Sequence, residues 1–186
     1  MASTFCRSLF LFMAYSKLPL GKKAPEIINA VVEIPRGAHN KYEYDEELDE
    51  IRLDRVLHSS VFYPVDYGFI PETRADDGDH LDVLVIISES VFPGCVVKVK
   101  VIGALDMEDE NGRDYKIVAV ALKDPRNEHI RTIEDLTEHF QKEVQNFFET
   151  YKKLENKWVK IKGWVGKEEA YKIIKEAKAK FDKETE

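Results

Sequence analysis

The sequence predicts an α+β fold, with an antiparallel, barrel-like sheet first and two helices after it. Two observations predict this order. Short β-branched or alternating runs fill the chain as far as about residue 122, too closely spaced for crossover helices between them, and apolar residues take helical spacing only from about residue 132. A barrel closes so many short strands without leaving long free edges.

The individual elements follow from local pattern. The strands are expected at residues 27–34, 41–44, 51–57, 81–88, 96–104, 115–122 and 158–161. Thr132, followed by an acidic residue three positions later, is the expected N-cap of the first helix. Its buried stripe would be Leu136, Phe140, Val144, Phe147, Tyr151 and Leu154. The second helix is expected from about Lys167, with Ala170, Ile173, Ile174, Ala177 and Phe181 buried.

Charge and length limit the classes of function. The chain has 186 residues, the size of one ordinary domain, and its 28 Lys and Arg against 35 Asp and Glu give a net charge of −7. Such a surface repels nucleic acids and anionic membranes, so neither is an expected partner. No apolar run reaches the roughly 18 residues of a membrane span. With Cys6 and Cys95 as the only cysteines, no disulfide framework can form, and we expect a reducing, cytoplasmic setting.

The N-terminus differs from the rest. Residues 1–16 are interpreted as an extension of uncertain status and residues 17–186 as a single domain. The first 25 residues contain basic but no acidic side chains and one short apolar run. Translation from a start codon upstream of Met13, or an N-terminal extension that packs on the domain, explains this composition better than a targeting segment does, because the apolar run is short.

The densest chemical signal is an acidic loop before an apolar strand, formed by Asp76, Asp77, Asp79 and Asp82 around Gly78. These carboxylates would repel one another unless a cation lay among them, and oxygen ligands favour hard ions such as Mg²⁺. The alternative is an acidic, solvated turn.

A second signal is the hairpin around Asn111-Gly112, a preferred two-residue type I′ turn. That turn would place Asp109 opposite Asp114 and set Lys116 on the same face. The alternative is a hairpin tip whose acids point into water.

Charges inside apolar strands form a third signal. Glu33 and Arg55 interrupt such runs and need partners, while Lys41 and Glu43 share one face of an alternating strand. An internal Glu33–Lys41 ion pair would satisfy the simplest interpretation. Together with the acidic signals, however, these cations suit a small polyphosphate held between metal ions and fixed positive charges. Phosphate-binding Gly-rich loops and nucleophile-elbow or H-E-x-x-H motifs do not occur.

The residues from Asp77 to Val85, D-G-D-H-L-D-V-L-V, closely resemble the family I soluble inorganic pyrophosphatase signature D-G-D-P-x-D-V-L-V. The resemblance extends from about Leu18 to near the end of the second helix. It includes the segments 32–35, 41–43, 54–55, 62–64, 66–68, 109–116 and 147–152.

The resemblance implies a five-stranded OB-like barrel with flanking helices and a homohexamer, as is common among prokaryotic members. It implies hydrolysis of pyrophosphate to two phosphates by Mg²⁺-activated water, through direct attack without a covalent intermediate. Several Mg²⁺ ions would bind per site, with Mn²⁺ or Zn²⁺ as possible substitutes. A non-enzymatic OB-type module that binds a metal or an acidic ligand through the same loops is the alternative.

The resemblance also implies residue roles. Asp79 resembles the proton acceptor for the attacking water. The metal ligands would be Asp77, Asp82, Asp109, Asp114 and Glu33, with Asp82 bridging two ions. The groups that hold phosphoryl oxygens would be Lys41, Arg55, Tyr67, Lys116, Tyr151 and Lys152, supported by Glu43 and Tyr63. His80 departs from the family pattern, which has proline there, so we expect altered loop rigidity or pH response with activity retained.

Overall fold

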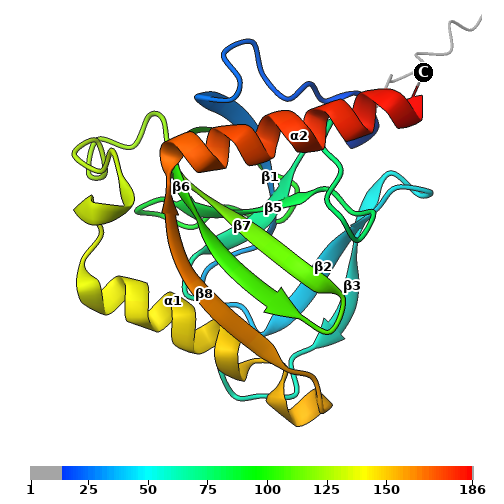
Figure 1. The fold of residues 1–186 in the computed structure, drawn as a ribbon. Helices are drawn as coiled ribbons and strands as arrows, with labels where there is room; N and C mark the ends of the chain where they lie inside the picture. Colours follow the sequence, from blue (N-terminus) through cyan, green and yellow to red (C-terminus); the bar gives the residue numbers. More distant parts are fainter. Residues whose placement is uncertain (1–13, 186) are drawn as a thin grey trace, which may run out of the picture.

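β-Strands occupy most of the chain between residues 27 and 121 of the computed structural model, which describes residues 14–185 (Figure 1). The strands are β1 Ile27–Ile34, β2 Asn40–Asp45, β3 Glu50–Val56, β4 Asp66–Ile70, β5 Leu81–Ile86, β6 Val96–Asp109, β7 Gly112–Ala121 and β8 Val159–Gly166. The helices are α1 Glu138–Thr150 and α2 Lys167–Thr185, with short 3₁₀ turns η1 Tyr15–Lys17, η2 Ile133–Asp135 and η3 Lys153–Glu155.

Five strands close into a ring, which confirms the α+β class and the five-stranded barrel. The pairing order is β1-β4-β5-β7-β6, and β6 pairs again with β1. β8 extends the sheet beyond β6, and β2 and β3 form a separate two-stranded ribbon.

The expectation of antiparallel pairing throughout is wrong at β5 and β7, which run parallel. The reason is geometric: strand direction cannot alternate around a ring with an odd number of members, so one pair must run the same way. That pair sets Asp82 directly beside Lys116.

β4 is the strand that sequence patterning did not predict. It has only five residues and contains Gly68, which propensity alone disfavours in a strand. The glycine is required because β1 passes so close that a Cβ on Gly68 would lie 1.8 Å from the carbonyl oxygen of Val31.

The two helices cover opposite faces of the sheet. Phe147 and Phe148 of α1 pack in one buried cluster with Leu84 and Val118, whereas Ile174 of α2 packs in a second cluster on the other face. Figure 1 shows α2 lying across the sheet and α1 beside β8. Because side chains alternate along strands, polar residues that share a face with Leu84 and Val118 lie on the α1 side.

The first helix begins later and ends earlier than expected. Thr132 caps the 3₁₀ turn η2, whereas Thr137 is the N-cap of α1, with its hydroxyl accepting a hydrogen bond from the Phe140 amide at 3.2 Å. The chain between them is extended at Leu136. Leu154 is 66% exposed, so the buried stripe ends at Tyr151.

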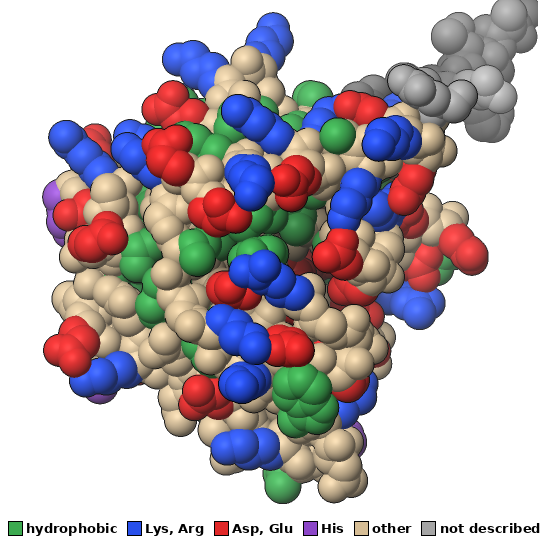
Figure 2. Space-filling view, viewed as in Figure 1, with side chains coloured by type: hydrophobic (Ala, Val, Ile, Leu, Met, Phe, Trp, Pro, Cys, Tyr) green, Lys and Arg blue, Asp and Glu red, His purple; other side chains and the backbone are tan. Residues whose placement is uncertain are grey.

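Of the predicted extension, residues 1–13 lie outside the described residues. Tyr15 packs edge-on against Tyr44, and the Ser16 hydroxyl donates to Asp49 at 3.1 Å. Within residues 14–185, no helix is long and apolar enough to cross a membrane. On the face shown in Figure 2, acidic and basic side chains are interspersed.

Candidate functional site

A polar cleft of about 300 Å³ opens where the ribbon β2–β3, the loop before β5 and the β6–β7 hairpin meet. It brings together all but one of the site residues predicted from sequence, from the strands β1 to β7, a loop and the end of α1. These lining residues are Glu33, Lys41, Glu43, Arg55, Tyr67, Asp77, Asp79, Asp82, Asp109, Asp114, Lys116, Tyr151 and Lys152. The exception, Tyr63, is buried beneath the cleft, with its ring 5.5 Å from that of Tyr67.

Lys116 occupies the centre of the acidic side. Its ammonium group donates to Asp82 on the parallel neighbour β5 and to Asp114 Oδ1 at 2.7 Å. Burial opposes the charged amine, yet Asp114 and Asp82 raise the pKa of Lys116 well above its usual range. The buried lysine therefore stays protonated and neutralises part of the carboxylate charge.

Three other acidic side chains of the cleft have raised pKa values. Burial first, and then the charge of Asp82, raise the pKa of Glu33 to about 8. Burial and the neighbouring carboxylates Asp77 and Asp82 raise the pKa of Asp79. Burial likewise raises the pKa of Asp114. In all three groups burial is the main cause of the raised pKa, and repulsion by neighbouring carboxylates adds to it.

The donor chemistry of this side fits hard divalent cations. Every candidate ligand is a carboxylate, the donor that Mg²⁺ and Mn²⁺ prefer. In residues 14–185, no three His, Cys, Asp or Glu side chains already converge on one ion position, and the Lys116 ammonium lies between Asp82 and Asp114 where a cation would neutralise them. The carboxylates would therefore need small side-chain shifts to bind ions.

The β6–β7 hairpin differs in register from the prediction. Asp109 pairs with Gly112 and Met107 with Asp114, so the turn residues are Glu110 and Asn111 and the two predicted acids are not directly opposite. The Asn111 amide donates to Asp109 at 2.8 Å, which favours this turn, one residue earlier than the predicted one. The displacement preserves side-chain parity, so Asp109, Asp114 and Lys116 still face the same cleft.

Lys152 connects the end of α1 to this hairpin. It follows the C-cap residue Tyr151, and its ammonium lies 2.8 Å from Asp109 Oδ2. Although burial raises it, the bonds from Lys152 and the Asn111 amide bring the pKa of Asp109 below its usual range.

The cationic side is built on the ribbon. Lys41 and Arg55 pair directly across β2 and β3, which sets two positive charges side by side. Burial, with Arg55 contributing, lowers the pKa of Lys41. Asp54 contacts both cations. Lys41 also pairs with Glu43, and Arg55 with Glu155. These carboxylates offset the repulsion between the two cations, and a bound anion could replace some of these contacts. The simple Glu33–Lys41 pairing does not form: Glu33 instead accepts the Tyr44 amide at 2.7 Å.

Aromatic rings form the apolar part of the wall. Burial raises the pKa of Tyr67 and Tyr63 well above the usual value and also raises that of Tyr151. All three phenols therefore remain protonated hydrogen-bond donors at neutral pH.

Sequence reasoning missed the residues that orient the site. Glu155 of η3 lies 3.0 Å from an Arg55 nitrogen with its side chain 9% exposed. Glu46 and Arg74 are joined at 2.7 Å beside His80. These pairs are separated by 28 to 100 positions in the chain, so no local spacing could indicate them.

Comparison with known proteins finds one family. The sequence profile described as inorganic pyrophosphatase matches residues 30–182. The inorganic pyrophosphatase of Thermus thermophilus is 50% identical over 167 residues, 88% of this chain and 95% of the relative, and that of Methanosarcina mazei is 52% identical over 151 residues, 81% and 89%. A crystal structure of the Thermus thermophilus enzyme superposes with a TM-score of 0.88 at 48% identity and covers 91% of this chain and 99% of its own. A Helicobacter pylori inorganic pyrophosphatase structure has a TM-score of 0.85 at 40% identity, covering 89% and 99%.

Proposed function

Because this chain belongs to the inorganic pyrophosphatase family and is an inorganic diphosphatase, which hydrolyses pyrophosphate to two orthophosphates, we propose that the polar cleft is its active site. The observation that supports this most is the division of the cleft into a carboxylate side around Asp82 and a cationic side around Lys41 and Arg55. A pyrophosphate anion needs positive charge on both sides, and the carboxylate side supplies it only with bound cations.

The carboxylates would hold several Mg²⁺ ions, with Mn²⁺ or Zn²⁺ as possible substitutes. The proposed ligands are Asp77, Asp82, Asp109, Asp114 and Glu33. The chemistry that these ions supply when bound is a lowered pKa of the attacking water and neutralisation of phosphoryl charge. Burial raises the pKa of Glu33 to about 8, and a cation bound nearby would favour its ionised form.

The side chains then divide the remaining tasks. Asp79 takes the proton of the attacking water, and its raised pKa brings it closer to the range of a general base. The phosphoryl oxygens are held by Lys41, Arg55, Lys116, Lys152, Tyr67 and Tyr151, while Glu43 and Tyr63 support them. The attack is direct, without a covalent intermediate, as the family resemblance implies.

The setting of the enzyme is proposed as well. Residues 17–186 act as a single catalytic domain in the cytoplasm, and six copies form a homohexamer without nucleic acid or membrane as partners. The net charge of −7 supports the exclusion of polyanions. Large exposed side chains, including Phe62, Phe92 and Trp158, offer apolar area for contacts between copies.

The test is phosphate release from pyrophosphate by the intact protein and by Asp79→Asn. The wild type should turn over with Mg²⁺, stop with a chelator and recover when Mg²⁺ is restored in excess. Asp79→Asn should lose at least about a hundredfold in kcat, the usual contribution of a general base, while the thermal midpoint and Mg²⁺ binding stay close to wild type. Near-normal turnover in Asp79→Asn would show that Asp79 is not the base.

A further inference from the structure

The loop between β4 and β5 carries Asp77 and Asp79 at its tip, where the Asp79 amide donates to Asp77 Oδ1 at 3.1 Å and Asp76 forms an ion pair with Lys180 of α2. Residues 76–79 are all exposed, and Gly78, with φ at +95°, has nothing within 4 Å of a Cβ built on it. Mutual repulsion of the acids works against a single loop conformation. An exposed tip of this kind is expected to open easily unless neighbouring elements hold it.

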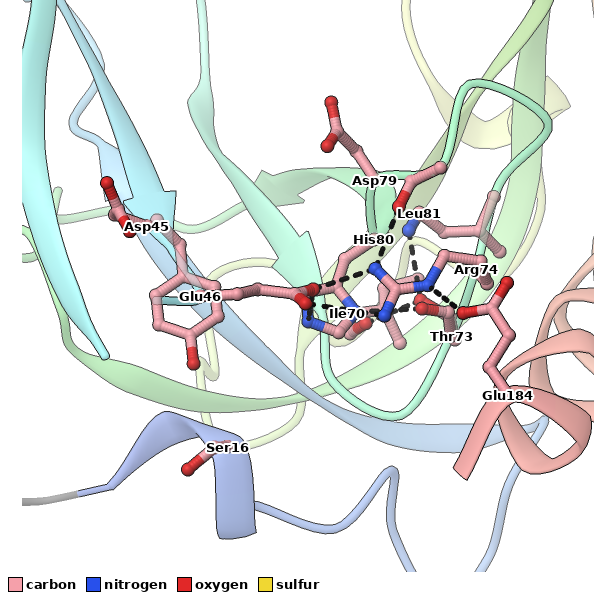
Figure 3. A network of polar contacts seen from close by, with 12 residues as sticks. Ser16, Asp45, Glu46, Ile70, Thr73, Arg74, Asp79, His80, Leu81 and Glu184 are labelled. Carbon is pink, nitrogen blue, oxygen red and sulfur yellow. Dashed lines mark hydrogen bonds and ion pairs between the residues drawn. The ribbon is translucent and has the colours of Figure 1, made fainter. Parts of the chain in front are cut away.

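Arg74 contacts three parts of the molecule at once (Figure 3). Its Nη1 donates to Glu46 Oε1 at 2.7 Å, in the turn between β2 and β3, and to the Gly78 carbonyl at 2.8 Å. Its Nε donates to Glu184 Oε2 at 2.7 Å, near the end of α2. The side chain is only 13% exposed. One guanidinium therefore joins the acidic loop to the ribbon that carries Lys41 and to the last helix.

His80 closes the same cluster from the other side of the loop. Its Nδ1 lies 2.7 Å from the Thr73 carbonyl and its Nε2 lies 3.0 Å from Glu46 Oε1. The ring stacks on Phe69, with centroids 5.1 Å apart and planes at 15°. Thr73, fully buried, links the two ends of the loop, donating to the Ile70 carbonyl at 2.6 Å and accepting from the Leu81 amide at 2.9 Å.

The cluster holds the backbone and leaves the carboxylate free. Figure 3 shows Asp79 pointing away from Arg74 and His80. The Gly78 carbonyl that Arg74 binds lies between Asp77 and Asp79 in the chain, and the Ala75 amide donates to the Asp79 carbonyl at 2.8 Å. Groups that orient ligands through their backbone or second contacts affect metal affinity strongly.

We propose that Arg74, which bonds Glu46 and the Gly78 carbonyl together, is a positioning residue that holds Asp77 and Asp79 at a fixed distance from the phosphate-holding cations on β2 and β3, with His80 anchoring the same loop to Thr73. This proposal rests on the roles proposed above for the two aspartates. It also assigns a task to His80: the imidazole anchors the loop by donating its Nδ1 hydrogen to the Thr73 carbonyl, at the position where the family signature has a ring-restrained proline.

The experiment measures Mg²⁺ affinity of the substrate-free protein by titration calorimetry for Arg74→Met, Arg74→Lys and Asp77→Asn. Arg126→Met, an exposed arginine on another loop, is the matched control. Arg74→Met should weaken Mg²⁺ binding about tenfold, as loss of an orienting partner does, and Arg74→Lys, which keeps the charge but not the fork, should recover only part of this loss. The control should bind as wild type.

Hydrogen exchange supplies a second readout, because it separates local opening of the loop from general destabilisation of the protein. In Arg74→Met the Ala75 amide should exchange at least about tenfold faster, while amides of β7 keep their protection. Unchanged Mg²⁺ affinity together with unchanged Ala75 exchange would overturn the proposal. If Asp77→Asn also leaves Mg²⁺ binding unchanged, the assignment of Asp77 as a ligand has failed instead.

A gentler variant covers the case in which Arg74→Met does not fold. Glu184→Gln removes one exposed contact of Arg74, with Glu176→Gln, exposed on the same helix, as its control. Glu184→Gln should weaken Mg²⁺ binding about twofold to threefold and speed Ala75 exchange, in line with the modest strength of an exposed ion pair. Equal behaviour of the two variants would contradict the positioning role.

Discussion

At the scale of single residues, the side chains of the cleft neutralise one another through internal ion pairs when no substrate is bound. Lys116 compensates Asp82 and Asp114, Lys152 compensates Asp109, and Asp54 contacts both ribbon cations. Each of these groups is thus held by an opposite charge within the cleft. When metals and substrate bind, contacts with these ligands would replace the ion pairs between side chains. Because the side chains are already held in place, binding would cost little further conformational entropy.

Glu155 is expected to set the position of Arg55. Its Oε2 lies 3.0 Å from Arg55 Nη2 and its side chain is nearly buried. Glu155 Oε1 and Arg55 Nε have no hydrogen-bond partner among the described residues. Glu155→Gln should raise KM for magnesium pyrophosphate roughly tenfold, the value of one charge-assisted hydrogen bond, with a smaller change in kcat.

Steady-state kinetics against Glu149→Gln, an exposed acid on α1, tests this expectation. The control should match wild type. An unchanged KM in Glu155→Gln would show that Arg55 is held adequately by Asp54 alone.

At the scale of elements, patterning predicted both helices and all the strands except β4, but not the hairpin register or the start of the first helix. β1, β6 and α2 lie where β-branched runs or a helical stripe predicted them. β4 was missed because it contains Gly68, which is rare in strands. This glycine is needed because β1 passes too close for a Cβ, not because β4 itself has an unusual backbone conformation. The hairpin register was wrong because Asp109 binds the Asn111 amide, a local contact that outweighs the Asn-Gly turn preference.

Much of the candidate site was predictable from the alternation of side chains along the strands. Side-chain parity along β6 and β7 survives the register error, so the acids and Lys116 still share a face. The family resemblance supplied the remaining roles. What could not be predicted was Lys116 lying between two carboxylates and the contacts of Arg74 and Glu155, because these depend on strand pairing and on residues distant in sequence.

Gly68→Ala tests the close approach of β1 and β4. A Cβ there would lie 1.8 Å from the Val31 carbonyl oxygen, so the strands must separate, and the free energy of unfolding should fall by about 3 kcal/mol. Gly166→Ala at the end of β8, where nothing lies within 4 Å, is the control and should change stability by less than about 0.5 kcal/mol. Denaturant unfolding measures both, and equal values would contradict the close approach of the two strands.

At the scale of the whole molecule, the net charge of −7 has two consequences. It opposes binding of polyanions over the general surface. Concentrated in the cleft, the same acidic excess opposes binding of pyrophosphate until cations enter. If the proposed metal ions bind, we expect the cleft to accept a small anion while the rest of the surface repels large ones.

Assembly is tested by the mass in solution. We expect light scattering coupled to size exclusion to give six copies of the 186-residue chain. The mass should not depend on Mg²⁺ or pyrophosphate, because the proposed ligands line the cleft and not the exposed apolar surface. A monomer at micromolar concentration would contradict the proposed hexamer.

The central claim, that the carboxylate side binds an anion only when divalent cations are present, is tested most directly by phosphate affinity. Inorganic phosphate, the reaction product, is titrated into the intact protein by calorimetry with Mg²⁺ and again with a chelator at equal ionic strength. Phosphate should bind with Mg²⁺ and bind at least about a hundredfold more weakly with the chelator, since repulsion by unpaired carboxylates then remains. Equal affinity under the two conditions would contradict the claim.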